Sequence, residues 1–550
     1  MRAFKELLQQ SSVQKDDEGP PDFDQQDDIS TREEFIKELT KVGGRSLWSL
    51  LVIILMCMPG FCYILLHTNF TKVTTSNFDT RCLIPELENA NWTYDDIRTI
   101  STPANANCSY YLYNYVILRG MGFKKALKRT RTLRPPSVAR CETFVHRSHN
   151  QYSLYQEFSL VCKQAIHEEF LNISPVYGKI FASLFLVPLA DLIGRKQLIN
   201  WGVRIFLAGG LVVALAPSFE ALVFGRVLIG MAYTTMIHSI EAVVVEISSI
   251  DVRPLRFIAM NTGIALGYCI VPLIATKVWH WRTLQWAVCS SLLILPLTAW
   301  LVPESPRWFF SKGRKAKAWA TLHTLRDPVA QSELLTAYRN DRKNYISEVH
   351  EHVNELRHFL TSKLWFLTAL FAFVGAVYFK NFVGRFPMKF IVTRKIYLIL
   401  SGGVEMISYM VCLALLLLPS RRTTMGISFF TCAILYIIAS QLKIGSIEGL
   451  VCILLTEIAS GSIHTSARLY IAENVPTSHR CTIAGFAEGM GAGISTIIMF
   501  NLYANFIQDK VLFLLLGCIC LLGTIMSYFA YEVKGKDIFD TIREMKRFRG

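Results

Sequence analysis

Charged residues are scarce in this chain. Asp, Glu, Lys and Arg make up only 18% of its 550 residues, whereas 52% are hydrophobic. A water-soluble chain of this length carries nearer a quarter charged residues and divides into two or three cores. The shortage of charge therefore excludes an ordinary soluble protein and indicates that lipid surrounds much of the chain.

Other signals are missing as well. The sequence has no nucleotide-binding loop, metal-ligand spacing or nucleophile constellation, so we expect neither an enzyme nor a bound cofactor or metal. The net charge of +15 does not indicate nucleic-acid binding, because no basic domain is separable from the apolar runs. No cleavable signal peptide is visible in the polar residues 1–40, so the first apolar run is expected to act as an uncleaved insertion signal.

Long apolar runs are abundant. A hydrocarbon layer of about 30 Å needs a helix of roughly 20 apolar residues to cross it. Twelve spans are predicted, at 46–67, 173–190, 198–217, 220–247, 257–277, 283–302, 364–382, 396–418, 423–440, 447–472, 482–505 and 510–532. The predicted fold class is an all-α membrane protein with two six-helix halves. Polar segments at 1–45, 68–170, 303–362 and 533–550 flank or join them.

The basic residues of the short connections orient these spans. An even number of spans places both ends on one side, where most loops rich in Lys and Arg also fall; the positive-inside rule assigns that side to the cytoplasm. We therefore predict a multi-pass plasma-membrane protein with both ends cytoplasmic. The connection after the seventh span disagrees, because it would place Arg385, Lys389, Arg394 and Lys395 outside. Either its boundaries are misread or a basic vestibule belongs to the site.

The long segment at 68–170 is predicted to be extracellular. It carries three Asn-x-Ser/Thr sequons, at Asn69, Asn91 and Asn107, which predict glycosylation. It also carries four cysteines, Cys82, Cys108, Cys141 and Cys162. In an oxidising compartment these allow two disulfides with three connectivities. The basic run at 124–134 is interpreted as a solvated face of this segment.

A repeated charge pattern relates the two halves. Glu246 ends the fourth span and is followed by six residues and Arg253; Glu473 ends the tenth and is followed by six residues and Arg480. Such charges can pair across the halves when the inner side is closed and separate into water when it opens. Two equivalent halves with a midplane site are typical of an alternating-access transporter.

Six motifs, spread in order over about residues 35–545, resemble those of one family. They are Asp79–Pro85, Glu157–Cys162, Asp191–Lys196, Gly225–Gly230, Pro303–Trp308 and Lys534–Lys536. The family is the organic cation/anion/carnitine transporter family (solute carrier family 22-like) of the major facilitator superfamily. The resemblance implies the major facilitator fold and a polyspecific carrier of organic ions.

The motifs also imply a set of gating residues. They are Asp191, Gly194, Arg195, Lys196, Arg226, Glu246, Arg253, Glu473 and Arg480. Some positions depart from the superfamily pattern: Val187 replaces a glycine, Leu192 replaces a basic residue, and the second-half copy of the loop is shortened to Ser420–Arg422. These departures leave room for a member that has lost transport.

Ionisable residues inside the spans are candidates for the substrate site. Each costs about 2.5–3.5 kcal/mol at the bilayer centre, so each should face protein or water. By the resemblance, Glu405 matches a glutamate of the cation carriers, and Tyr409 stands where anion carriers have lysine. Ala492 stands at the family's charge-selecting position. Glu488, one turn away, is interpreted either as a substitute acid or as a structural partner of a basic neighbour.

The tenth span carries a polar stripe. Glu457, His464 and Arg468 are spaced to share one helical face. In one interpretation His464 titrates near neutral pH and couples protons. In the other, the stripe is an interhelical network in which Arg468 pairs with an acid such as Glu405 or Glu488.

The seventh span supplies aromatic candidates. Phe373 and Tyr378 are predicted to hold an ammonium group by cation–π contact, whereas Lys380 favours an anion. The leading hypothesis is a carrier of small organic cations or zwitterions; an organic anion exchanger and a non-transporting receptor or scaffold are the alternatives. The expected partners are a small organic ion, membrane lipid and, through the extracellular loop, a second copy of the chain.

Overall fold

The structure is a computed structural model. It describes residues 23–42, 47–68, 80–90, 92–103, 108–132, 137–146, 154–158, 160, 165–277, 280–326, 394–418, 420–442, 446–498, 509–542 and 544–545. Several predictions fall outside these residues: the seventh span with Phe373, Tyr378 and Lys380, the connection after it at 383–393, the three sequons, and Cys162.

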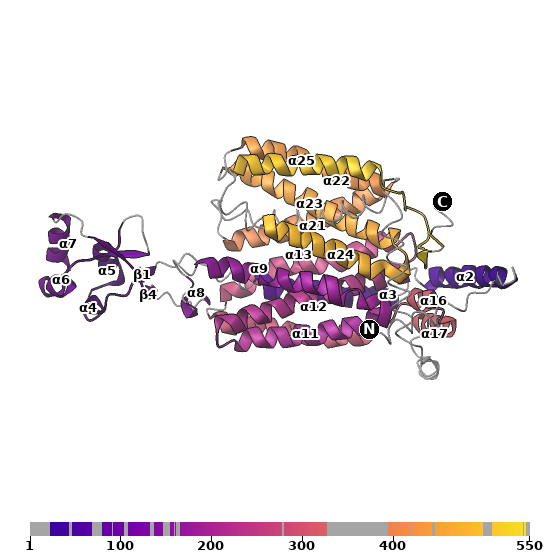
Figure 1. Cartoon of the computed structure of the whole chain (residues 1–550), viewed down its shortest axis with the longest axis horizontal. Helices are drawn as coiled ribbons and strands as arrows, with labels where there is room; N and C mark the ends of the chain where they lie inside the picture. Colours follow the sequence, from indigo (N-terminus) through magenta and orange to yellow (C-terminus); the bar gives the residue numbers. More distant parts are fainter. Residues whose placement is uncertain are drawn as a thin grey trace, which may run out of the picture.

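A bundle of long helices forms the body of the protein (Figure 1). The first half contains α3 (Leu47–Thr68), α9 (Ala165–Phe181), α11 (Arg195–Leu215), α12 (Phe219–Ile247), α13 (Arg253–Lys277) and α14 (Trp281–Ser290). The π-helical turn η3 (Ala182–Leu186) and α10 (Leu189–Ile193) prolong α9, and η4 (Ser291–Ile294) and α15 (Leu295–Leu301) prolong α14.

The second half contributes five described helices. They are α21 (Arg394–Leu416), α22 (Arg421–Gln441), α23 (Ile447–Asn474), α24 (Arg480–Ile498) and α25 (Asp509–Tyr528). Within the described part of the chain, eight helices are long and apolar enough to cross a membrane, and α3 and α9 contain shorter apolar stretches. The bundle is thus the helical membrane body that the apolar runs predict.

The helix boundaries follow from local chemistry. Ser218, Ser420 and Ser446 each accept a hydrogen bond from a backbone N–H of the first turn, and so cap α12, α22 and α23. The second predicted span begins at residue 173, yet α9 begins at Ala165. The apolar run marks only the part suited to lipid, and the polar first turns of α9 continue the same helix beyond it.

The two halves meet along two helix pairs, α13 against α21 and α9 against α24. Small residues permit the close approach. A Cβ on Gly402 would lie 2.5 Å from the Cys269 sulfur, and one on Gly485 would lie 2.9 Å from the Ser183 carbonyl oxygen. Gly489 also faces Ser183. The glycine stripe of the eleventh predicted span is therefore a helix contact between the halves.

A small folded unit projects from one end of the bundle (Figure 1, indigo to purple). It contains two antiparallel strand pairs, β1 (Thr80–Cys82) with β4 (Phe144–His146) and β2 (Ser109–Tyr111) with β3 (Val138–Arg140). Its helices are α4 (Pro85–Glu88), α5 (Tyr94–Ser101), α6 (Tyr115–Met121) and α7 (Phe123–Thr132). A separate core of buried apolar side chains includes Ile84, Leu87, Ile97, Ile100 and Leu118.

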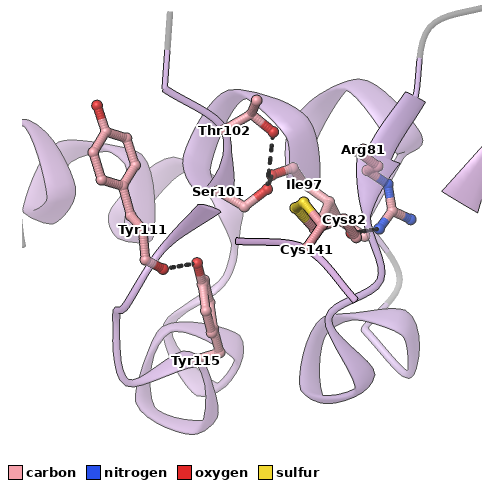
Figure 2. Close-up of a disulfide and its surroundings, with 8 residues drawn as sticks. All are labelled: Arg81, Cys82, Ile97, Ser101, Thr102, Tyr111, Tyr115 and Cys141. Carbon is pink, nitrogen blue, oxygen red and sulfur yellow. Dashed lines mark hydrogen bonds between the residues drawn. A yellow bond between two sulfur atoms is a disulfide. The ribbon is translucent and has the colours of Figure 1, made fainter. Parts of the chain in front are cut away.

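A disulfide between Cys82 and Cys141 fastens this unit (Figure 2). The Cα atoms lie 5.3 Å apart and the residues are 59 positions apart in sequence. Closing so long a loop restricts the unfolded chain and so favours the folded one. Cys108 is also disulfide-bonded. The structure thus selects, from the three connectivities, the one that contains the Cys82–Cys141 bond.

A clamp joins a short helix, which follows the projecting unit in the sequence, to the rest of the bundle. Glu157, at the end of α8 (Leu154–Glu157), accepts hydrogen bonds from Trp281 Nε1 at 2.7 Å and Arg282 Nε at 3.1 Å. Arg282 also donates to the carbonyl oxygens of Ala214 and Ala216 at 3.0 and 2.8 Å. Burial raises the pKa of Glu157, but the hydrogen bonds and the Arg282 charge outweigh it, so this pKa lies below its usual value.

This clamp predicts an acid-sensitive contribution to stability. Since the folded-state pKa of Glu157 is lowered, its stabilisation is present above the unfolded-state pKa of about 4.3 and is lost as the pH falls through the folded value. Glu157→Gln should therefore lower the melting temperature of the purified protein at pH 7, at a cost on the order of 1 kcal/mol. The difference between the two proteins should shrink as the pH falls below about 4.3, and Glu142→Gln, on an exposed residue of the projecting unit, is the control. Equal melting temperatures at pH 7 would contradict the clamp.

Candidate functional site

Ionisable and aromatic side chains of both halves meet midway along the bundle helices. The first half supplies them from α3, α9, α12 and α13, and the second from α21, α23 and α24. We term this set the central cluster; it comprises Tyr63, Lys179, Tyr233, His238, Glu241, Asn261, Tyr268, Glu405, Tyr409, Glu457, His464, Arg468 and Glu488.

An ion pair across the halves lies within the central cluster. Arg468 on α23 binds Glu241 on α12, and its Nη1 donates to Asn261 Oδ1 on α13 at 3.3 Å. All three side chains are buried. The sequence led us to expect Glu405 or Glu488 as the acid. The direct partner is Glu241, because α12 faces α23 across the interface, which spacing along one helix does not reveal; Glu488 interacts with Arg468 only electrostatically.

A lysine lies against two stacked tyrosines. The ring centroids of Tyr63 and Tyr233 are 3.9 Å apart, and Lys179 Nζ lies 4.9 and 5.0 Å from them. Lys179 also interacts electrostatically with Glu488. A tyrosine pair that holds an ammonium group is a cation–π site. Sequence analysis missed Lys179, although a lysine inside a predicted apolar span is itself a signal.

An acidic and aromatic region lies where α13 of the first half meets α21 and α23 of the second half. Tyr409 donates a hydrogen bond of 2.7 Å to Glu405 Oε1, and Tyr268 of α13 interacts electrostatically with both Glu405 and Glu457. Gly461 lets α23 approach α21, since a Cβ there would lie 2.4 Å from Ser408 Oγ. Glu405 and Glu457 are half-buried, as is Glu488.

The charges of the central cluster do not balance. Its four carboxylates belong to Glu241, Glu405, Glu457 and Glu488, whereas its fixed positive charges are those of Lys179 and Arg468. Counted over these described residues, the cluster carries two more negative than positive charges; Lys380 of the seventh predicted span lies outside the described part of the chain. In a region of low dielectric, that excess attracts a cation.

A second set of charges lies at one end of the bundle, which we term the tail end. It is the end next to α2 (Phe23–Val42), α16 (Pro306–Ser311), α17 (Lys315–Arg326) and residues 531–545, opposite the projecting unit (Figure 1). Arg307 donates to Asp537 Oδ1 at 2.7 Å, and Arg32 donates to Asp540 Oδ2 at 3.1 Å. The residues after α25 thus bind both α16 and α2.

Glu246 binds one arginine from each half. Its Oε1 lies 3.1 Å from Arg195 Nη2, at the start of α11, and 2.5 Å from Arg480 Nη1, at the start of α24. All three side chains are almost fully buried. Arg195 also donates to the Thr477 carbonyl oxygen of the second half at 2.6 Å.

Glu473 repeats this arrangement with the halves exchanged. It lies 3.0 Å from Arg421 Nε of its own half and 3.6 Å from Arg253 Nη1 of the first half. The shortened loop at Ser420–Arg422 therefore retains the arginine that corresponds to Arg195. The sequence pattern Glu-x6-Arg marks both cross-half pairs, Glu246 with Arg480 and Glu473 with Arg253.

Glutamates that follow the last span of each half cap the same loops. Glu304 accepts hydrogen bonds from the N–H groups of Arg195 and Lys196 at 2.9 and 3.1 Å, and Glu532 accepts one from the N–H of Arg421 at 2.9 Å. Burial raises the pKa of Glu304 to about 7, against the opposing effect of Arg195 and these donors. Gly194 is required here: its φ is +111°, and a Cβ would lie 2.4 Å from Glu304 Oε2.

One cross-half contact of the first half has no counterpart among the described residues of the second half. Asp191 is fully buried, and its Oδ2 accepts from the N–H and the hydroxyl of Thr482 at 2.8 Å each, at the start of α24. Asp191 lies four residues before Arg195, and the residue four before Arg421 is Leu417, which has no carboxylate. The cross-half contacts are therefore stronger on the Asp191 side.

Arg226 does not join the tail-end charges. It is buried on α12, but 20 residues before Glu246 on the same helix, which corresponds to about 30 Å. The resemblance grouped it with the gating residues as part of the fourth-span motif, and the structure places it near the opposite end of α12 from Glu246. Lys196 lies nearer to the tail-end charges, and its Nζ donates to the Trp300 carbonyl oxygen at 3.2 Å.

The tail-end pairs predict how readily a nearby thiol reacts. Cys481 is a free, buried cysteine beside Arg480. Glu246→Gln removes the acid shared by two buried arginines, a change that costs about 3–5 kcal/mol for a buried pair. We expect N-ethylmaleimide to label Cys481 at least about 10-fold faster in Glu246→Gln, as measured by peptide mass spectrometry, since tenfold corresponds to only about 1.4 kcal/mol. Arg422→Gln, on an exposed residue, should leave the rate unchanged; an unchanged rate in Glu246→Gln would refute the role given to this acid.

Known proteins resemble the chain both in sequence and in fold. An organic cation transporter-like protein of Drosophila melanogaster is 25% identical over 506 residues, covering 86% of this chain and 85% of that protein. Organic anion transporter 3 of Mus musculus is 26% identical over 416 residues, covering 72% and 75%. The proton:xylose symporter XylE, bound to 6-bromo-6-deoxy-D-glucose, superposes with a TM-score of 0.60 at 14% identity, covering 92% of this chain and 99% of that one.

These comparisons agree with the geometry. The likeness to XylE is one of fold, and it identifies the two-half helical bundle as the major facilitator fold. Residues 141–545 match the family described as "Sugar (and other) transporter", and this range includes both cross-half ion pairs and most of the central cluster. The chain therefore belongs to the sugar (and other) transporter family.

Proposed function

We propose that this transporter moves small organic cations or zwitterions across the plasma membrane by alternating access, with the central cluster as its substrate site. The observation that carries the proposal is the excess of carboxylates among the described residues of that site. The relatives named as organic cation transporters support the same substrate class.

Within the substrate site, the acidic region suits an ammonium group better than the region around Lys179 and Arg468 does. Glu405 and Glu457 supply negative charge, and Tyr268 and Tyr409 supply rings beside it. Half-buried carboxylates attract a cation more strongly than carboxylates in water do, because the surrounding dielectric is lower. The aromatic faces replace part of the hydration that the cation loses on entering.

The positive groups of the site determine how well it could bind the carboxylate of a zwitterionic or anionic substrate. Arg468 and Lys179 are already engaged, Arg468 by Glu241 and Lys179 by two tyrosines. A substrate carboxylate would have to compete with these contacts, whereas a substrate cation meets acids in excess. Organic anion exchange is the second candidate: Lys179 and Arg468 favour it, as does the relative named organic anion transporter 3.

The tail-end ion pairs support alternating access. Glu246 and Glu473 each join arginines of both halves, so the two halves are held together at this end. We assign the tail end to the cytoplasmic side and these pairs to the inner gate. Opening it would separate the pairs into water, where each contact is worth little, so they bias the equilibrium between states.

Neutralising the acids should reduce cation uptake. We expect Glu405→Gln and Glu457→Gln each to lower tetraethylammonium uptake in expressing cells by at least about 10-fold, equivalent to the loss of about 1.4 kcal/mol of binding. Glu448→Gln is the matched control, since Glu448 is exposed in the first turn of the same helix α23 as Glu457. Full cation uptake in both variants, together with benzoate uptake that Lys179→Ala abolishes, would favour the anion alternative.

Reversing a gate charge should impair turnover more than folding. Arg195→Glu and Arg253→Glu each place two carboxylates together where an ion pair now lies. Uptake per molecule at the cell surface should fall severalfold while surface labelling falls less, and Arg422→Glu serves as the exposed control. Normal uptake in both variants would remove these residues from the gate.

A further inference from the structure

A buried histidine next to the central ion pair has no evident structural task. His238 on α12 is only 2% exposed, and neither of its ring nitrogens makes a hydrogen bond to any described residue. Its Nδ1 lies 3.3 Å from Glu241 Oε2, one turn further along the helix. Buried polar groups are almost always hydrogen-bonded, so an exception of this kind indicates a functional constraint.

His238 lines a small cavity between the central cluster and the tail end. The cavity is bounded by α12, α23 and α24 and therefore by both halves of the protein. Its polar lining consists of His238, Glu241, Arg468 and Arg480, and the remaining residues are apolar. A group bound there would contact both halves at once.

The charges that face His238 come from three helices. On α12 it faces Glu241; on α23, Arg468; on α24, Arg480 and the Cys481 thiol, whose sulfur lies 3.9 Å from the His238 carbonyl oxygen. Each arginine is already paired with an acid, Arg468 with Glu241 and Arg480 with Glu246. Arg195 also binds Glu246, and Asp191 binds Arg195. Asn261 on α13 is neutral and holds Arg468.

This arrangement makes the charge of His238 depend on Arg468. While Arg468 binds Glu241, a proton on His238 would add a second positive charge to a pair that is already neutral. If Arg468 moves away, toward Glu488 for example, Glu241 is left as a buried, unpaired carboxylate, which is strongly unfavourable. A proton on His238 would then restore a neutral pair, imidazolium with carboxylate.

We propose that His238 and Glu241 form a proton-binding site whose occupancy is set by Arg468. The proton comes from water, binds a ring nitrogen of His238, and is held by the contact between Nδ1 and Glu241 Oε2; it leaves when Arg468 returns to Glu241. Because Arg468 belongs to the second half and Glu241 to the first, proton binding is linked to the relative position of the halves. This site adds a coupling proton to the proposed transport but does not depend on which substrate is carried.

The site is tested by deuterium exchange at the imidazole C2 position, read by mass spectrometry for each histidine over pH 5–9 in purified protein reconstituted in lipid nanodiscs. Arg468→Gln should move the half-exchange pH of His238 upward, and Glu241→Gln should move it downward, each by about 1 unit or more for loss of a charge within ~4–6 Å. Arg468→Lys, which keeps the charge, should change it little. His323, exposed on α17, is the internal control and should not shift.

An unchanged half-exchange pH of His238 in both charge-removing variants overturns the proposal, and so does a shift at His464 without one at His238. Because this measurement uses no substrate, a protein that fails to take up tetraethylammonium would refute the proposed function and leave the proton site standing. Where uptake occurs, its variation over pH 5.5–8.5 should disappear in His238→Gln and persist in His323→Gln. Persistence in His238→Gln would break the link between the site and transport.

Discussion

Buried charge at the interface between the two halves is the constraint on which the rest of the structure depends. A carboxylate removed from water costs several kcal/mol unless cations surround it. Glu246 and Glu473 meet this requirement only by drawing arginines from both halves. The same contacts that satisfy the buried acids therefore hold the halves together at the tail end. A protein that alternates between two states can use these contacts, because on opening each charge exchanges its partner for water at little net cost.

The two halves are related but not equivalent. Glu304 and Glu532 cap matching loops, and Arg195 and Arg421 take matching places beside Glu246 and Glu473. The symmetry ends at Asp191, which caps the start of α24 from the other half. Its counterpart position is occupied by Leu417.

A consequence of this asymmetry concerns the order of opening. On the Glu473 side the cross-half contact is longer, because Arg253 lies 3.6 Å from Glu473, and the position that corresponds to Asp191 is a leucine. We expect that side to loosen first when the tail end opens. The cluster formed by Asp191, Arg195, Glu246 and Arg480 would then act as the last contact to separate.

The helices could be predicted from the sequence because the membrane imposes a simple rule: an apolar run of sufficient length becomes a helix. The boundaries agree to within two residues for α12 and α22, where a serine caps the first turn. The predicted boundaries differ from those of α9 and α25. Helix α9 begins before the apolar run does, and α25 ends at Tyr528, before the apolar run ends. The charge pairs were predictable because Glu-x6-Arg recurs at the same helix ends.

The central site was less predictable, for a physical reason. Periodicity along one helix shows which residues share a face, but not which helix that face meets. Glu457 and Arg468 were found in this way, whereas Glu241 and Lys179 were missed because their partners lie on other helices. His238 was missed although its contact, Glu241, lies on the same helix. An ionisable residue inside an apolar span was the available signal for each of them.

The central claim is that cross-half ion pairs hold the tail end closed. It is tested most directly by a pulsed electron-resonance distance between spin labels on non-canonical amino acids at Ala316 of α17 and Arg422 of α22, both exposed at the tail end on opposite halves. The account predicts one short distance in the otherwise unchanged protein. It predicts an added, longer population when Glu246 and Glu473 are both replaced by Gln. An identical distance distribution in the two proteins would contradict it.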